Sequence, residues 1–199
     1  MSNECRVGLL GMGTVGSAVA DLLLRRGEEI ARRTGTRVTL HKVAVARPGR
    51  PRAVSLPEGL LVGDARAVVD DPAVDIVVEV MGGLEPARTY IAGALAKGKS
   101  VVTANKQLMA ARGDELLRTA AVAGADLFFE ASVGGGIPVI KIMTESLAGN
   151  TIRGITGILN GTTNYILTRM SHDGVGFSEA LVAAQQRGFA ESEIGRAHV

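Results

Sequence analysis

Residues 5–16, CRVGLLGMGTVG, decide the fold. An apolar run ends at Leu10, and three glycines follow in the spacing Gly11-x-Gly13-x-x-Gly16. Apolar residues then recur at helical spacing, so the glycines sit between a predicted strand and a predicted helix. This context is the one that a dinucleotide-binding turn requires.

Each glycine of the turn has a physical role. Gly11 allows the tight turn, Gly13 lets the backbone approach a pyrophosphate, and Gly16 lets the helix pack closely on the sheet. The free N–H groups at the helix start, around Thr14 and Val15, would face the phosphates with the help of the helix dipole. The alternative is a glycine-rich helix start without a ligand, but its place at the first strand–helix junction favours cofactor binding.

Strands and helices are predicted to alternate along the rest of the chain. Short aliphatic strands typical of a sheet buried on both faces are expected at residues 38–45, 75–80, 100–103 and 127–130, and helices between them at 85–96 and 113–123. The pattern predicts an α/β fold: a Rossmann-type doubly wound parallel sheet over residues 1–130, the NAD(P)-binding domain.

A second domain is expected to start at about residue 131. After a glycine-rich segment, residues 138–147, 162–170 and 178–187 have helical patterns, and 152–159 has a strand-like pattern. We interpret residues 131–193 as the start of an α/β substrate domain.

Composition excludes several classes of protein. Hydrophobic residues make up 46% of the chain, enough for a real core. The formal net charge of +2 is too small to indicate a nucleic-acid or membrane partner. The single cysteine, Cys5, excludes an internal disulfide. With no signal-like or membrane-spanning apolar run, the expected location is the cytoplasm.

The end of the second predicted strand bears on cofactor choice. NAD binding usually places an acidic residue there, but the sequence reads VAVARP over residues 43–48. Arg47 could instead pair with a 2′-phosphate, and Arg50 or Arg52 could share that role. We therefore expect NADP, with NAD as the alternative cofactor and a solvated loop arginine as the alternative role of Arg47.

Four later segments go beyond a generic Rossmann domain: DIVVEVMGG at 75–83, GKSVVTANK at 98–106, FEASVGGGIP at 129–138 and GILNGTTNYIL at 157–167. In this order and spacing the chain resembles homoserine dehydrogenases from Arg6 to about Glu191. The resemblance implies NADP-dependent interconversion of L-homoserine and L-aspartate 4-semialdehyde in threonine and methionine biosynthesis, by a homo-oligomer. No nucleic-acid or membrane partner is implied.

The resemblance also implies roles for single residues. Lys106 follows the end of a predicted strand, where open α/β sheets place their ligands. It would contact the cofactor and take part in proton handling, the alternative being a surface lysine. The family pattern places a monovalent cation such as sodium on Glu130, Val133, Gly135 and Ile137, since hard cations prefer oxygen ligands. The alternative for this segment is a hinge without an ion.

Two further segments would meet the substrate. The resemblance places Asn160 and Thr162 near it, although Thr162 or Thr163 could simply cap the following helix. Glu191 would bind the ammonium group of the amino acid, the alternative being a surface glutamate.

The pattern breaks after residue 192, where the family continues with Asp-Pro and this chain reads EIGRAHV. The proton-donating lysine expected downstream is absent, so an incomplete fragment is expected. ATC GGA AGA GCA CAC GTC, which encodes residues 194–199, is similar to a sequencing adapter. These residues are therefore interpreted as a non-native tail, and resequencing through the junction tests this.

Two other functions are compatible with a Rossmann-type sequence. An aldehyde-oxidising dehydrogenase would need a catalytic cysteine, and Cys5 at the start of the first strand is misplaced for that role. A non-catalytic module that binds NADP without turnover is the second rival.

Overall fold

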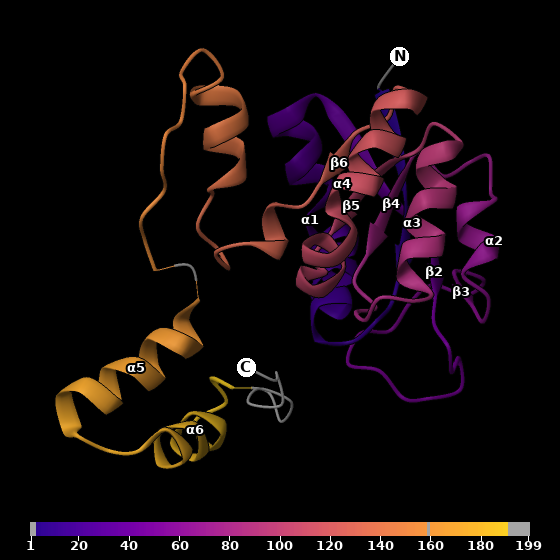
Figure 1. Ribbon diagram of the computed structural model, residues 1–199. Coiled ribbons are helices and arrows are strands. Elements are labelled where there is room, and N and C mark those ends of the chain that lie inside the picture. The colour runs from indigo at the N-terminus through magenta and orange to yellow at the C-terminus, as the bar shows by residue number, and fades with distance from the viewer. Residues whose placement is uncertain (1–2, 159, 191–199) are drawn as a thin grey trace. The chain divides into compact units, whose positions relative to one another are not determined.

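The computed structural model describes residues 3–158 and 160–190. The chain divides into two compact units, Met1–Val133 and Gly134–Val199, here called the N-terminal and C-terminal units. Each is described by itself (Figure 1).

The N-terminal unit is a six-stranded parallel sheet with strand order β3-β2-β1-β4-β5-β6. The chain winds outward from β1 in one direction through β2 and β3, and in the other through β4, β5 and β6. This confirms the Rossmann-type doubly wound sheet. The elements are β1 (Asn3–Leu10), α1 (Thr14–Thr34), β2 (Thr36–Ala44), β3 (Leu61–Val62), α2 (Arg66–Val69), β4 (Ile76–Glu79), α3 (Ala87–Ala96), β5 (Ser100–Thr103), α4 (Lys106–Ala123), β6 (Leu127–Phe128) and the 3-10 turn η1 (Glu130–Ser132).

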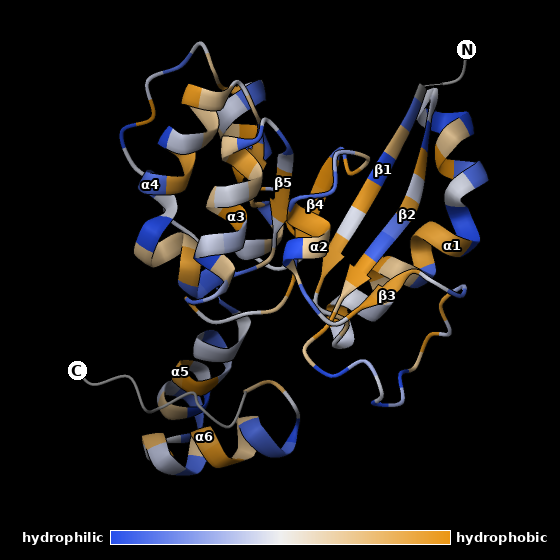
Figure 2. Cartoon of the chain, turned by 90° about the vertical axis from the view of Figure 1, so that its right-hand side faces the viewer, coloured by the Kyte–Doolittle hydropathy of each residue, from blue (hydrophilic) through white to orange (hydrophobic). Residues whose placement is uncertain are grey.

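Helices cover both faces of this sheet. On one face Leu9 and Val43 pack with Ala20 of α1. On the other, Leu10 and Val77 pack with buried residues of α2, α3 and α4. Because successive strand residues point to opposite faces, the aliphatic strands supply both cores at once. Figure 2 shows α1 on one side of the sheet and α3 and α4 on the other.

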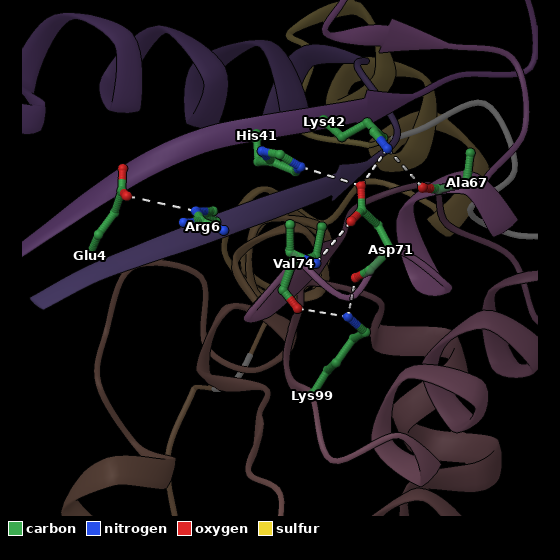
Figure 3. Close-up of polar contacts among 9 residues, drawn as sticks. Glu4, Arg6, His41, Lys42, Ala67, Asp71, Val74 and Lys99 are labelled. Carbon is green, nitrogen blue, oxygen red and sulfur yellow. Dashed lines mark hydrogen bonds and ion pairs between the residues drawn. The ribbon is translucent and has the colours of Figure 1, made fainter.

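An irregularity in β2 changes which side chains share a face. Val7 of β1 pairs with Leu40 and Gly8 pairs with Lys42, which leaves His41 as an extra residue. Such a bulge interrupts the alternation of side chains. As a result both His41 and Lys42 reach the carboxylate of Asp71 (Figure 3), the histidine at 3.3 Å.

Asp71 belongs to a turn that is fixed from two directions. The pKa of the Asp71 carboxyl is held well below its usual range. The hydrogen bond from the Lys42 side chain is the main cause, and the Ala73 N–H and His41 contribute. Lys99, nearly buried, donates to the carbonyl oxygens of Asp71 and Val74. Burial lowers the pKa of Lys99. These bonds join β2, the turn before β4 and the start of β5.

Some predicted bounds were wrong. The helix expected at 113–123 begins at Lys106, because Asn105 caps it and Gly113 is accommodated inside it against Met109. The strand expected at 127–130 ends at Phe128, where the chain turns into η1. The segment between β2 and α2, for which no strand was predicted, contains β3, which pairs with the end of β2.

The C-terminal unit contains the π-helix η2 (Ile142–Ser146), α5 (Gly161–Asp173) and α6 (Phe177–Gln186). Ile166 packs there with small residues of α6. The strand expected at 152–159 is wrong over 152–158, which has no regular structure, and residue 159 lies outside the described residues. A strand needs a partner for its backbone groups, and every strand in the described part of the chain belongs to the other unit.

Candidate cofactor site

The glycine turn Gly11–Gly16, here called the phosphate turn, has the geometry that its glycines predict. Gly11 has φ +99°, and its N–H donates to the carbonyl of Ala44 at 2.9 Å. A Cβ at Gly11 would lie 2.8 Å from the carbonyl oxygen of Val80. A Cβ at Gly16 would clash with the carbonyl oxygen of Gly11. These two glycines therefore hold β1, α1 and the end of β4 in close contact.

Gly13 has a different role. It is the N-cap of α1, with no side-chain cap, and a Cβ there would meet nothing within 4 Å. The fold itself therefore does not require a glycine at this position. The open space and the uncapped N–H groups of the first turn suit a phosphate group that approaches the backbone.

A cavity of about 1040 Å³ opens in front of this turn. Its walls come from the phosphate turn, the end of β2 with the loop after it, the start of α2, and the end of β4 with the start of α3. From the predicted cofactor set it includes Gly11, Gly13, Thr14 and Arg47. Gly16 lies buried behind the turn, and Val15 is half exposed outside the lining. The cavity lies at the carboxyl ends of the strands beside the switch between β1 and β4, where such sheets bind ligands.

The three arginines after β2 all line this cavity, but they are not equivalent. Arg52 donates to the carbonyl oxygens of Pro48 at 2.8 Å and of Arg50 and Arg47 at 2.6 Å each. Its guanidinium therefore folds the loop, whereas Arg47 and Arg50 are exposed beside the cavity.

Glu79 was not predicted as a site residue, yet it organises one wall of the cavity. This fully buried carboxylate accepts from the N–H groups of Met81 at 2.8 Å and Gly82 at 3.1 Å. Met81 and Gly82 line the cavity. The available signal was an acidic residue at the end of an otherwise aliphatic strand.

Lys106 lies outside that cavity lining. It is the first residue of α4, is exposed, and lines a second hollow of about 720 Å³ with Phe129, Ser132 and Val133. The preceding residue, Asn105, donates to the carbonyl of Gly83 at 2.7 Å, which ties the start of α4 to the loop after β4. The contact of Lys106 with the cofactor stays a prediction.

The predicted cation ligands fall in both units. Glu130 and Val133 belong to η1 and its C-cap in the N-terminal unit. Gly135 and Ile137 belong to a turn in which the Ile137 N–H donates to the carbonyl of Gly134 at 3.2 Å. No group of three or more His, Cys, Asp or Glu residues suited to a metal occurs among the described residues. The predicted set depends mainly on carbonyl oxygens and stays a prediction.

The substrate candidates lie in the C-terminal unit. Asn160, not Thr162 or Thr163, caps α5, and its side-chain oxygen accepts from the Thr163 N–H at 2.9 Å. An Asn at this position has the preferred N-cap geometry, with extended backbone. The Thr162 hydroxyl instead donates to the carbonyl of Phe189. Glu191 and the tail 194–199 lie outside the described residues.

A parallel sheet wound outward from β1, with a glycine turn opening α1 onto a cavity at its carboxyl edge, defines a dinucleotide-binding domain of the Rossmann class. Two family models match: "Homoserine dehydrogenase, NAD binding domain" over residues 11–130 and "Homoserine dehydrogenase" over 138–195. The chain belongs to the homoserine dehydrogenase family.

Individual relatives agree with this assignment. A homoserine dehydrogenase from Synechocystis is 48% identical over 189 residues, 94% of this chain and 43% of the relative. The crystal structure of one from Thiobacillus denitrificans has a TM-score of 0.82 at 44% identity, covering 96% of this chain and 44% of that one. A hyperthermophilic archaeal homoserine dehydrogenase in complex with NADPH has a TM-score of 0.76 at 26% identity, covering 96% and 63%. The chain thus spans less than half the length of its curated relative from Synechocystis.

No helix among the described residues is long and apolar enough to cross a membrane.

Proposed function

We propose that the complete protein interconverts L-homoserine and L-aspartate 4-semialdehyde with NADP(H), and that residues 1–130 bind the cofactor. The observation that carries the proposal is the cavity in front of Gly11–Gly16, which combines an open, uncapped helix N-terminus with Arg47 at its edge. The proposed substrate domain is residues 131–193.

The preference for NADP rests on the end of β2. Val45 and Ala46 line the cavity where an NAD site would place an acidic residue. Asp64 also lines the cavity, but its carboxylate accepts from the Arg66 N–H at 2.8 Å and so helps to start α2. Arg47 is therefore the group proposed to pair with a 2′-phosphate, with Arg50 beside it. The archaeal relative, solved with NADPH, supports this choice.

The chemistry divides between cofactor and protein. NADPH, when bound, supplies the hydride that reduces the aldehyde carbon. Lys106 is proposed to contact the cofactor and handle a proton, while Glu191 binds the substrate ammonium group and Asn160 and Thr162 lie near the substrate. The main proton-donating lysine is proposed to lie in the part of the complete protein that this chain lacks, downstream of residue 193.

Several finer proposals accompany this one. Glu130, Val133, Gly135 and Ile137 are proposed to hold a monovalent cation such as sodium, since a carboxylate and carbonyls provide hard oxygen ligands. The complete enzyme is proposed to be a cytoplasmic homo-oligomer that serves threonine and methionine synthesis.

The first experiment titrates this chain with NADPH and with NADH. The chain has no tryptophan, so the emission of the reduced cofactor can be followed without transfer from indole. NADPH should bind more tightly than NADH, and Arg47→Ala should remove most of the difference. Arg37→Ala is the matched control, because it removes one exposed positive charge from the other end of β2.

The second experiment measures turnover of homoserine with NADP and NAD on a chain completed from the source gene. Activity in the completed protein and its absence in this chain would support the proposal that this chain binds the cofactor but lacks the proton-donating lysine. Cofactor binding without turnover in either protein would favour a binding module or a different dehydrogenase.

A further inference from the structure

Glu79 ends β4 in a position that a carboxyl group rarely occupies, since it is fully buried. Among the described residues its side chain has three hydrogen-bond partners, and all three are donors. One oxygen accepts from the N–H groups of Met81 and Gly82, and the other accepts from the Thr103 hydroxyl at 2.6 Å. Acceptance at both oxygens is the role of an ionised carboxylate. Such bonds to a charged acceptor are roughly twice as strong as neutral ones.

Thr103 fixes the direction of this network. Its hydroxyl oxygen accepts from the Asn105 N–H at 3.1 Å, which leaves its own proton for Glu79. Its carbonyl accepts from the Ser132 hydroxyl, also at 3.1 Å. Thr103, Asn105 and Ser132 are all buried, so each lost bond would leave a polar group without water.

The network reaches the wall of the cofactor cavity and also the start of α4, where Lys106 lies. Met81 and Gly82 form part of the cofactor cavity wall. Asn105 accepts from the Leu108 N–H at 3.1 Å, which sets the start of α4 where Lys106 lies. One buried carboxylate thus holds the cavity wall in register with the helix that carries Lys106.

We propose that Glu79 is a positioning residue for NADP(H): it holds the Met81–Gly82 turn in the shape that the cofactor meets and, through Thr103 and Asn105, sets the start of α4. The inference rests on the proposed function for the identity of the ligand. If the cavity wall is already ordered in the free protein, binding does not include the entropic cost of ordering it. The affinity for the ligand is therefore higher. Glu79 itself is separated from the ligand by the turn that it holds.

The decisive variant is Glu79→Gln, which keeps the size and removes one acceptor. The amide nitrogen would face either the two N–H groups or the Thr103 hydroxyl, which already accepts from Asn105. In the first orientation the amide donors oppose the two N–H donors. In the second the Thr103 hydroxyl can accept from the amide through its second lone pair, but its own proton loses the Glu79 acceptor, so either orientation costs at least one hydrogen bond. We expect NADPH binding about tenfold weaker, equal to the loss of one bond to a charged group. The amide protons of Met81 and Gly82 should exchange faster without ligand.

Two further variants separate positioning from general stability. Thr103→Ser keeps the hydroxyl and should retain near-normal NADPH affinity, whereas Thr103→Val removes it and should resemble Glu79→Gln. Val77→Ala is the matched control: Val77 is buried two residues earlier on the same face of β4, so it lowers stability without touching the network. Its NADPH affinity should stay at the wild-type value below its melting temperature.

The outcomes separate the two proposals. No NADPH binding by the wild-type chain overturns the proposed function. Wild-type binding with unchanged affinity and exchange in Glu79→Gln overturns the positioning role alone. If Glu79→Gln does not fold, the Thr103 pair decides: equal affinities in Thr103→Ser and Thr103→Val overturn the inference, and a Val-specific loss supports it.

Discussion

The ammonium group of Lys99 donates a 2.7 Å hydrogen bond to the carbonyl oxygen of Val74, in the turn that leads into β4 (Figure 3). The same ammonium group reaches the carbonyl of Asp71, so one nearly buried side chain closes the turn over four residues. This lysine lies at the amino end of β5, whereas the cofactor cavity lies at the carboxyl ends of the strands. Its role is therefore in folding.

Lys99→Met should destabilise the fold and leave the cofactor site intact. Methionine matches the length of the lysine stem but leaves two carbonyls without this donor, at a cost of about 1–3 kcal/mol. Urea unfolding measures the loss. Lys97→Met, which removes a half-exposed lysine paired with Asp70, is the control and should cost much less. Equal midpoints for both variants would contradict the role of Lys99.

Asp71→Asn should lower the free energy of unfolding at neutral pH and make this free energy less dependent on pH in the acid range. Lys42, the Ala73 N–H and His41 depress the pKa of the Asp71 carboxyl in the folded state. A depressed carboxyl contributes stability above the unfolded pKa of about 3.9, and the contribution is lost as pH falls further. The difference between wild type and variant should therefore shrink below about pH 4 in urea midpoints taken across pH. A difference constant down to strong acid would refute this origin.

Gly16→Ala and Gly13→Ala should separate folding from ligand binding. The Cβ of Gly16→Ala clashes with the carbonyl of Gly11, so the melting temperature should fall even without ligand. Gly13→Ala has open space and φ −79°, so its melting temperature should hold while NADPH affinity falls at least about tenfold. Thermal melts and NADPH titration measure the two effects. Unchanged affinity in Gly13→Ala would argue against phosphate binding at this turn.

Asn160→Ser tests whether Asn160 does more than cap α5. Serine is also a preferred N-cap, so stability should hold, whereas Asn160→Ala should cost about 1 kcal/mol. If the carboxamide also serves the substrate, Asn160→Ser raises the KM for homoserine in the completed protein. Normal kinetics in Asn160→Ser would reduce Asn160 to a helix cap.

The sequence alone predicts the fold class and the phosphate turn because both depend on local pattern. Strand, glycine turn and helix are adjacent in residues 5–16, and the alternation of aliphatic strands with helices determines a parallel sheet. The same locality explains the failures. Residues 152–158 have a strand-like pattern, but no pattern can provide a partner strand.

Only the tertiary structure decides how distant side chains meet. Glu79 and Thr103 are 24 residues apart in the sequence, and only the pairing of β4 with β5 brings a carboxyl and a hydroxyl to one edge. The bulge in β2 likewise gives Asp71 two basic partners that strict alternation would separate. The folded loop assigns Arg52 to backbone carbonyls and leaves the Arg47 side chain exposed beside the cavity. Sequence pattern thus determines which backbone forms, whereas the direction and partners of polar side chains follow from strand register and loop closure.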